Sequence, residues 1–358
     1  MSFGLSVYFG LDNTKEENIK LLKDAHELGF TRIFTSLHIP EANYEVLKVE
    51  VKEFFKLAKE YDMDIISDIS PNTFKFLDLE DMDLKGLRDM GVKTIRIDFG
   101  YSEEDIAKMS NNEYDIKVQL NASTITEEFF NELDKYSAKY ENIDALHNFY
   151  PRVGTGISEE CMINKNNLLN KKGIKPCAFV QSNNRKRSPL KDGLPTLEDH
   201  RGMEVRAAAN HLFALGNTSV FIGDSLPSFN ELKDLSSLNP EVVELDIKVK
   251  CKDEITLRLL NEIYSARTDE ARDAIRASES RLILKGDIIE PFNTVNKEYG
   301  DITIDNKDYL RYMGELQIVK TSKEKDSRTN IVASILQKDV YLLKYIYGGK
   351  KFHFNIIE

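Results

Sequence analysis

Residues 5–37, LSVYFGLDNTKEENIKLLKDAHELGFTRIFTSL, have the pattern of one complete strand–helix–strand unit. Short apolar runs open and close the stretch, and the segment between them carries apolar residues at helical spacing: Ile19, Leu22, Ala25 and Leu28. Thr14 with Glu17 three residues later is the capping-box pattern of a helix start, and Gly29 suits a helix end. The stretch therefore predicts two parallel strands joined by a helix, which is the βαβ unit.

The same alternation continues through the first two-thirds of the 358-residue chain. Apolar, β-branched runs bounded by polar residues predict strands that are covered on both faces: 5–9, 31–37, 64–69, 94–99, 116–121, 143–150, 175–182 and 219–224. Eight units of about 30 residues each predict a (β/α)₈ TIM barrel over residues 1–238, closed by a helix around 228–238. An open doubly wound sheet is the alternative. The count of eight and the lack of a glycine-rich nucleotide turn after the first strand argue against it.

The pattern changes near residues 239–240. Beyond them, short runs with strand character are separated by polar, turn-rich segments: 241–251, 280–285, 301–305, 314–320, 340–347 and 351–357. Residues 239–358 are therefore expected to form a second, small all-β barrel or sandwich domain.

The charge balance limits the partners that the protein can have. Asp and Glu number 60 against 49 Lys and Arg, which gives a net charge of -11. Such a surface repels phosphate backbones and anionic lipids, so we expect no nucleic-acid and no membrane partner. An anionic small substrate would need a local basic pocket.

The cysteines and the N-terminus indicate the compartment. Cys161, Cys177 and Cys251 lie far apart, without the spacing of a zinc site or a disulfide framework. The first ten residues, MSFGLSVYFG, lack the features of a signal peptide, and no apolar stretch approaches the 18 residues of a membrane span. We therefore expect a cytoplasmic protein without a structural zinc site.

A barrel of this kind carries its active site at the C-terminal ends of its strands. Asp68 ends the third predicted strand and Asp98 lies near the end of the fourth. Neighbouring strands lie about 4.8 Å apart, so these carboxyls could serve as the acid and the nucleophile or stabiliser of a glycosidase. The alternative is that one of them caps the next helix or pairs with Arg96 or Arg152.

Other polar side chains near the strand ends suit a hydroxyl-rich, anionic ligand. The candidate substrate-binding residues are Tyr8, Asn121, His147, Asn148, Tyr150, Arg152, Gln181, Arg185 and His200. His147 is expected to contact or orient the substrate, although a strand-end histidine often only bonds a neighbour. Arg152 is a candidate for a phosphate or carboxylate through its bidentate fork, with a surface ion pair as the alternative.

A long loop, NNRKRSPLKDGLPTLEDHR at residues 183–201, follows the seventh predicted strand. The cations within 185–191 could cover an anionic substrate, although a run of charges is usually only solvated. Glu198 is a candidate third catalytic carboxylate. The same segment also has the pattern of a helix start with Thr196 as its cap, in which case Glu198 and His200 serve the helix terminus.

Several of these stretches together resemble the bacterial 6-phospho-N-acetylmuramidase (MupG-type) family, some of whose members carry the label "outer surface protein". The resemblance rests on LSVYFG, on IRIDFGYS with Asp98, on LNAS, HNFYPR and DGLPTLEDHR, and on IGD at residues 222–224. It covers essentially the whole chain and implies a cyclophilin-like barrel for the C-terminal domain.

The resemblance implies a cytoplasmic glycoside hydrolase without a cofactor. Its substrate would be the anionic disaccharide N-acetylmuramyl-6-phosphate–N-acetylglucosamine, cleaved at the β-1,4 bond during peptidoglycan recycling. The choice of Asp68 and Asp98 is a chemical inference from the predicted strands and is not carried over from the family. The C-terminal domain could shape the site, form a homodimer, or do both.

Two other functions are compatible with the sequence. One is a metal-dependent sugar-phosphate isomerase or epimerase, whose activity a chelator would abolish. The other is a non-catalytic binding protein built on the same barrel, which Asp68 and Asp98 argue against without excluding it.

Overall fold

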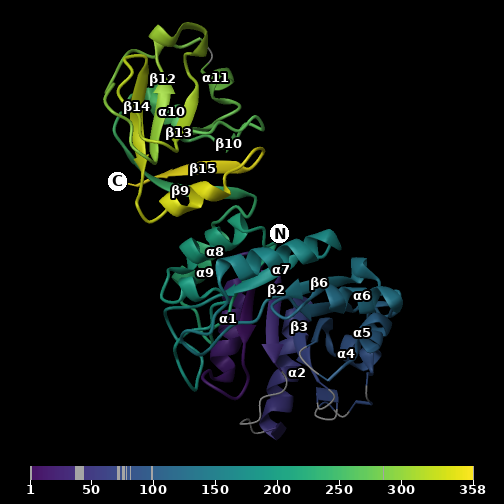
Figure 1. Ribbon diagram of the computed structural model, residues 1–358. Helices are drawn as coiled ribbons and strands as arrows, with labels where there is room; N and C mark the ends of the chain where they lie inside the picture. The colour runs from purple at the N-terminus through teal and green to yellow at the C-terminus, as the bar shows by residue number, and fades with distance from the viewer. Residues whose placement is uncertain are drawn as a thin grey trace. The chain divides into compact units, whose positions relative to one another are not determined.

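Figure 1 shows the computed structural model of the chain, which describes residues 2–36, 44–70, 73–74, 77, 79–80, 82–97, 100–284 and 286–357. For residues 44–49 it describes the backbone alone. The chain divides into two compact units, Met1–Leu238 and Asn239–Glu358. Each unit is described below by itself.

The first unit is a closed barrel of eight parallel strands in sequential order, as predicted. The strands are β1 (Ser2–Val7), β2 (Arg32–Ser36), β3 (Asp64–Ile69), β4 (Val92–Ile97), β5 (Lys117–Asn121), β6 (Ile143–Leu146), β7 (Pro176–Val180) and β8 (Ser219–Ile222). β1 pairs with β2 on one side and with β8 on the other, which closes the ring. The open doubly wound sheet is therefore wrong for this chain.

Helices follow the strands and surround them (Figure 1). They are α1 (Lys15–Glu27), α2 (Tyr44–Glu60), α4 (Leu84–Met90), α5 (Glu103–Ser110), α6 (Glu127–Lys135), α7 (Glu159–Lys171), α8 (Val205–Ala214) and α9 (Phe229–Ser236), with 3₁₀ turns at Tyr140–Asn142 and Glu198–His200. The capping box at the start of α1 is confirmed, because Thr14 and Glu17 bond each other's backbone N–H groups.

The predicted helix start at Thr196 is wrong. Residues 198–200 form one 3₁₀ turn without a side-chain cap, and α8 begins only at Val205. The Thr196 hydroxyl instead accepts a bond from the backbone N–H of Phe179 and donates to the carbonyl of Asn148. Thr196 therefore ties the loop after β6 to β7.

Side chains that point inward fill the barrel in layers, because alternate strand residues face the same side. At the N-terminal end, Arg32 donates to Asp64 at 3.0 Å and to Asp144 at 2.7 Å. Above this layer, Phe34 of β2 contacts Phe179 of β7 with ring centroids 5.3 Å apart. β2 and β7 are not neighbours, so this contact crosses the barrel interior.

The second unit contains a seven-stranded sheet in the order β10-β15-β9-β14-β12-β13-β11. Its strands are β9 (Val242–Val249), β10 (Tyr264–Ser265), β11 (Ala274–Arg276), β12 (Asp301–Asp305), β13 (Leu316–Val319), β14 (Thr329–Ile335) and β15 (Lys351–Ile356), joined by α10 (Glu254–Leu260), α11 (Ser280–Ile283) and 3₁₀ helices at Lys307–Tyr312 and Val340–Tyr345. Two predicted strands are wrong, because 280–283 is α-helical and 340–345 is 3₁₀-helical. Short apolar runs do not distinguish a strand from a buried helical turn.

No described helix of either unit is both long and apolar enough to cross a membrane.

Candidate active site

Three polar side chains meet where β3, β4 and β6 end. Arg96 of β4 donates from Nη1 to Asp68 of β3 at 2.8 Å and from Nη2 to the side-chain carbonyl of Asn148 at 2.5 Å. The register explains the first contact, because Asp68 is opposite Arg96 in the parallel pair. Arg96 is only 3% exposed, whereas Asp68 and Asn148 are partly exposed at the mouth of the barrel. A buried guanidinium thus fixes a carboxylate and an amide that solvent or a ligand can reach.

Aromatic side chains lie beside this group. The Phe149 ring lies 6.1 Å from Phe34, 5.1 Å from Phe179 and 6.4 Å from Tyr8, measured between centroids. Phe34 and Phe179 are buried, whereas Phe149 is partly exposed. The ring centroid of Phe34 is also 5.9 Å from the guanidinium carbon of Arg96. Phe149 therefore covers the apolar barrel interior at the end where Asp68 lies, as aromatic residues do under sugar rings in binding sites.

Asp98, the second predicted carboxylate, lies outside the described residues. It follows β4 directly in the sequence, since this strand ends at Ile97.

His147 is buried and holds the loop after β6. Its Nδ1 is 3.1 Å from the Ser123 hydroxyl, which accepts the backbone N–H of Asn148, and its Nε2 is 3.0 Å from Asn166 Oδ1. Burial lowers the pKa of His147 to about 4, so the ring is neutral at physiological pH. Both ring nitrogens of His147 thus lie within hydrogen-bond distance of protein side chains, and Ser123 links the ring to the backbone of Asn148.

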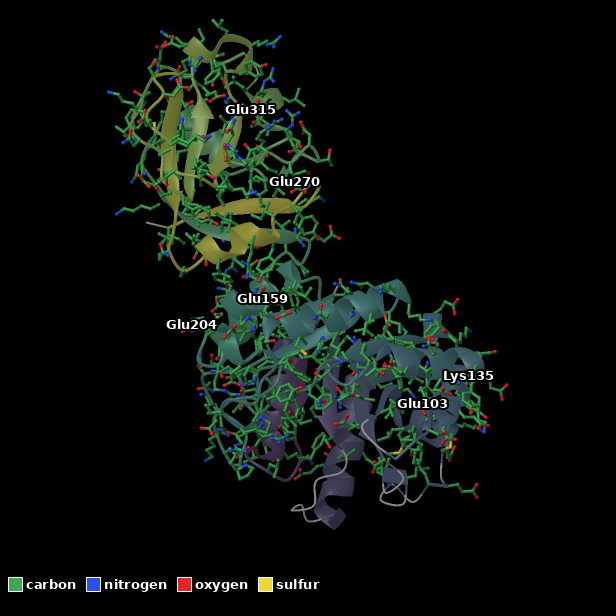
Figure 2. The ribbon with its side chains drawn as sticks, viewed as in Figure 1. Glu103, Lys135, Glu159, Glu204, Glu270 and Glu315 are labelled. Atoms are coloured by element: carbon green, nitrogen blue, oxygen red, sulfur yellow. The ribbon has the colours of Figure 1, made fainter. Side chains whose placement is uncertain are left out.

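His200 lies away from this group. It is fully buried, and its Nε2 is 2.9 Å from Nδ1 of His211 on α8. Burial, and then the nearby His211, lower the pKa of His200 to about 3. His211 is in turn 3.6 Å from Glu159, which Figure 2 labels and which lies in the first turn of α7. These contacts place His200 between helices, not at the mouth.

The other predicted binding residues are spread over the C-terminal end. Asn121 ends β5, and its Oδ1 accepts the backbone N–H of Ser123. Gln181 is 1% exposed and donates to Asn183, while its Oε1 is buried without a partner among the described residues. Tyr8 is fully buried and donates to the carbonyl of Gly223. Tyr150 is partly exposed and Arg152 is exposed.

Arg185 is paired with a carboxylate of the first helix. Its Nη1 donates to both carboxylate oxygens of Glu17 on α1, at 2.9 and 2.8 Å. A guanidinium already paired in this way has less to offer an incoming anion.

The carboxylate of Glu198 connects two loops. Its carboxylate accepts the backbone N–H groups of Gly154 and Gly156, each at 2.8 Å, and two bonds from Arg201 at 2.7 and 2.9 Å. Arg201 continues to the carbonyls of Tyr150 and Arg152. The bond from Arg201, and then those from the glycine amides, lower the pKa of Glu198 to about 2. With four donors on its two oxygens, we assign to Glu198 the role of tying the loop after β6 to the loop after β7.

Glu198→Gln is therefore expected to reduce stability more than catalysis. Charge-assisted hydrogen bonds are worth about 1.5–3 kcal/mol each when one partner is removed, so the free energy of unfolding should fall by about that amount. A carboxyl whose pKa is lowered in the folded state stabilises above its unfolded pKa, near 4.3. The difference in the free energy of unfolding between wild type and variant should have its full value above about pH 5 and disappear as the pH falls toward 2. Denaturant titrations at several pH values measure it.

The same variant tests the catalytic hypothesis for Glu198. We expect kcat at neutral pH to stay within about tenfold of wild type, since a lost acid–base group costs about 10²–10⁴-fold. A larger loss in a fully folded sample would return Glu198 to the catalytic residues.

A cavity of about 800 Å³ lies at the opposite, N-terminal end of the barrel and is lined by Arg32, Asp64, Lys117 and Asp144 among others. We do not assign the chemistry to this cavity, because barrel enzymes react at the C-terminal ends of their strands. Among the described residues, no three His, Cys, Asp or Glu side chains form a group that could hold a metal ion.

The first unit is a (β/α)₈ barrel whose C-terminal end carries polar and aromatic side chains, and the second unit is built on a β-sheet. Many enzymes that act on small molecules have such a barrel. Comparison with protein families makes this specific. Residues 3–237 match the N-terminal model and residues 243–355 the C-terminal model of 6-phospho-N-acetylmuramidase. The chain therefore belongs to the 6-phospho-N-acetylmuramidase family, which is a family of glycoside hydrolases, and the resemblance seen in the sequence is confirmed.

Two solved structures are similar over nearly the whole chain. An uncharacterized protein of B. cereus is 30% identical with a TM-score of 0.85, and the match covers 100% of this chain and 99% of that one. A conserved protein of unknown function from Enterococcus faecalis is 32% identical with a TM-score of 0.68, covering 99% of this chain and 96% of that one. No curated protein matches the chain significantly.

Proposed function

We propose that this protein hydrolyses the β-1,4 bond of N-acetylmuramyl-6-phosphate–N-acetylglucosamine in the cytoplasm, as a step of peptidoglycan recycling. The observation that carries the proposal is the match of both units to the 6-phospho-N-acetylmuramidase family. The carboxylate, guanidinium and aromatic rings at the C-terminal mouth support it, because a glycosidase needs a carboxylate beside the bond and a surface for the sugar ring.

Asp68 and Asp98 remain the proposed catalytic pair. Asp68 is already bonded to Arg96, an arrangement that suits the ionised partner, which faces the positive charge of the oxocarbenium-like transition state. We therefore assign to Asp98 the donation of a proton to the leaving oxygen. In this proposal Asn148 bonds a hydroxyl or an acetamido group of the substrate near Asp68, and its contacts with Arg96 and Ser123 support that role.

Residues 1–238 carry this chemistry in the proposal. Residues 239–358 form the second domain, for which we propose a cyclophilin-like barrel that assists the site or forms a homodimer. The seven-stranded sheet supports a β-sheet core for this domain. Light scattering of the full chain, compared with a chain that ends at Leu238, tests the homodimer.

The proposal is tested by incubating the purified protein with the phosphorylated disaccharide and measuring the release of N-acetylglucosamine. Release that persists in EDTA is expected. Conversion to an isomer without release would favour the metal-dependent isomerase or epimerase, and saturable binding without turnover would favour a binding protein. Either result would overturn hydrolysis as the function.

Retention of the anomeric configuration is expected. Asp68 lies in β3, and Asp98 directly follows the neighbouring strand β4 in the sequence. Neighbouring strands lie about 4.8 Å apart. Retaining glycosidases hold their carboxyls about 5–5.5 Å apart, whereas inverting ones need about 6.5–9.5 Å for a water. NMR in the first minutes should show the β-anomer of the phosphorylated muramyl sugar. An α-anomer released first would refute retention.

Two routes to retention differ in the nucleophile, which is either a carboxylate or the acetamido oxygen of the substrate. A thiazoline that mimics the oxazoline intermediate distinguishes them. Inhibition supports the substrate-assisted route, and its absence leaves the enzyme carboxylate as the nucleophile.

A further inference from the structure

One cation at the barrel mouth has a setting that the neighbouring arginines lack. The guanidinium carbon of Arg187 lies 4.7 Å from the ring centroid of Tyr8 and 5.0 Å from that of Phe149. Arg187 is half-buried, and no carboxylate pairs with its guanidinium within the described part of the chain. Its Nε is buried there without an acceptor. Two aromatic faces thus hold a guanidinium whose hydrogen-bond donors are not used by an acidic residue.

The backbone that carries Arg187 is fixed by Asp224 at the end of β8. This carboxylate is fully buried and accepts three backbone N–H groups: Ser182 at 2.9 Å, Arg187 at 3.0 Å and Leu194 at 3.2 Å. The start, the middle and the end of the loop after β7 are therefore bonded to one side chain. Asp224 is thereby a positioning residue of the mouth.

A second carboxylate holds the next residue of the same loop. Asp12, from the connection between β1 and α1, accepts the backbone N–H of Ser188 at 2.8 Å and the Ser188 hydroxyl. It also accepts the Ser225 hydroxyl at 2.8 Å. Asp224 and Asp12 thus bond to the consecutive residues Arg187 and Ser188. This part of the loop therefore has little conformational freedom left to lose when a ligand binds.

The neighbouring arginines show why Arg187 differs from them. Arg185, two residues earlier, is bonded to Glu17, and Arg96 is bonded to Asp68 and Asn148. The guanidinium of Arg187 lies near two aromatic rings, no carboxylate in the described part of the chain pairs with it, and its planar fork matches two oxygens of a phosphate. The chain is acidic overall, with a net charge of -11, so such a local cation is what an anionic ligand requires.

We propose that Arg187 binds the phosphate monoester of the substrate and so places the phosphorylated sugar against Phe149. The inference rests on the proposed function and makes it more specific. Among the candidates that the sequence offers, which are Arg152 and the cations within 185–191, it assigns the phosphate contact to Arg187. Phe149 contacts both Arg187 and Phe34, and Phe34 in turn contacts Arg96, so the cation and the Asp68 group share one aromatic surface.

The test compares kcat/KM for the disaccharide with and without the 6-phosphate. Two charge-assisted bonds predict that the wild-type enzyme prefers the phosphorylated form by about 10²–10⁴-fold. Arg187→Gln should lose about 10²–10³-fold on that form and less than about threefold on the other, so that the preference collapses. Arg187→Lys should recover part of the loss, since it restores the charge without the fork.

Arg185→Gln is the matched control, because it removes the same charge from the same loop but from a guanidinium bonded to Glu17. It should keep the wild-type preference. Arg187→Gln should fold, since the loop is held through backbone atoms by Asp224 and Asp12, and equal thermal melts verify this. An unchanged preference in folded Arg187→Gln would overturn the inference.

Two further experiments distinguish a wrong assignment of Arg187 from a wrong proposed function. A phosphorylated disaccharide that lacks the lactyl group distinguishes the two anions of the substrate. If Arg187→Gln lost its discrimination for the lactyl carboxylate and kept it for phosphate, the assignment would be wrong. Calorimetric binding of N-acetylglucosamine 6-phosphate tests the contact without hydrolysis: binding by wild type but not by Arg187→Gln supports the inference even if no disaccharide is cleaved, and equal binding overturns it.

Discussion

Asp68→Asn is expected to lower kcat by a factor of about 10² or more, because it removes a charged group from beside the reacting bond. The fold should persist. Asparagine is nearly isosteric, and its side-chain carbonyl can still accept the bond that Arg96 donates at 2.8 Å in the wild type. KM should change less than kcat, since the charge matters most in the transition state. Steady-state kinetics with the phosphorylated disaccharide measure both.

Asp62→Asn provides the matched control. Asp62 lies just before β3, at the other end of the strand that Asp68 occupies, and its side chain is 94% exposed beside Lys93. The same substitution there should leave kcat unchanged. Asp98→Asn is the parallel test of the second carboxylate. If both Asp68→Asn and Asp98→Asn keep wild-type kcat, the pair is structural, and Glu198 becomes the next candidate despite its four donors.

The barrel could be predicted from the sequence because its signals are local. The capping box of α1 and the β-branched runs are each contained within a few neighbouring residues. The runs at 280–283 and 340–345 are equally apolar but became helical, because nothing in a run of four to six residues fixes its period. Tertiary packing decides such segments.

The partners of the site residues could be predicted only in part. The sequence left open whether an aspartate caps the next helix or pairs with Arg96 or Arg152, and the register of β3 and β4 brings Asp68 opposite Arg96, across 28 residues of chain. The amides that Glu198 accepts lie 42 and 44 residues away, on a loop whose path follows no local pattern. The sequence therefore placed Asp68 at a strand end but left open whether Glu198 faces a substrate or another loop.

Phe149 is not among the candidates that the sequence suggests, and Arg187 is only one of the loop cations within 185–191 that the sequence leaves undistinguished. Phe149 stands between Asn148 and Tyr150, and Arg187 between Lys186 and Ser188. Their contact needs the loop after β7 to lie over the end of β6, which Asp224 and Asp12 bring about. A signal did exist: an aromatic residue directly after a strand and an arginine in the facing loop are the usual components of a sugar-phosphate site.

Arg32→Met should destabilise the barrel unit strongly. Arg32 is 9% exposed and bridges Asp64 and Asp144, whose side chains are 24% and 14% exposed. Breaking a buried ion pair by removing one partner costs about 3–5 kcal/mol, because the remaining charges stay poorly hydrated. Because the two carboxylates are partly exposed, we expect a loss of stability near the lower end of this range. For a unit of this size, the melting temperature should fall by about 6–20 °C, which calorimetry measures.

The control for this variant also removes the two carboxylates that Arg32→Met leaves without their partner. Arg32→Met combined with Asp64→Leu and Asp144→Leu should regain much of the lost stability, since apolar residues of similar volume often replace a buried ion group without a net cost. Failure of the triple variant to recover would mean that packing around Arg32, including its contact with the Phe221 ring at 5.5 Å, matters more than charge.

In either variant, kcat per folded molecule should equal that of wild type. The Arg32 group lies at the N-terminal end of the strands and Asp68 at the C-terminal end, so stability and chemistry are assigned to opposite ends of the barrel. A proportional loss of kcat in the folded fraction would contradict that division.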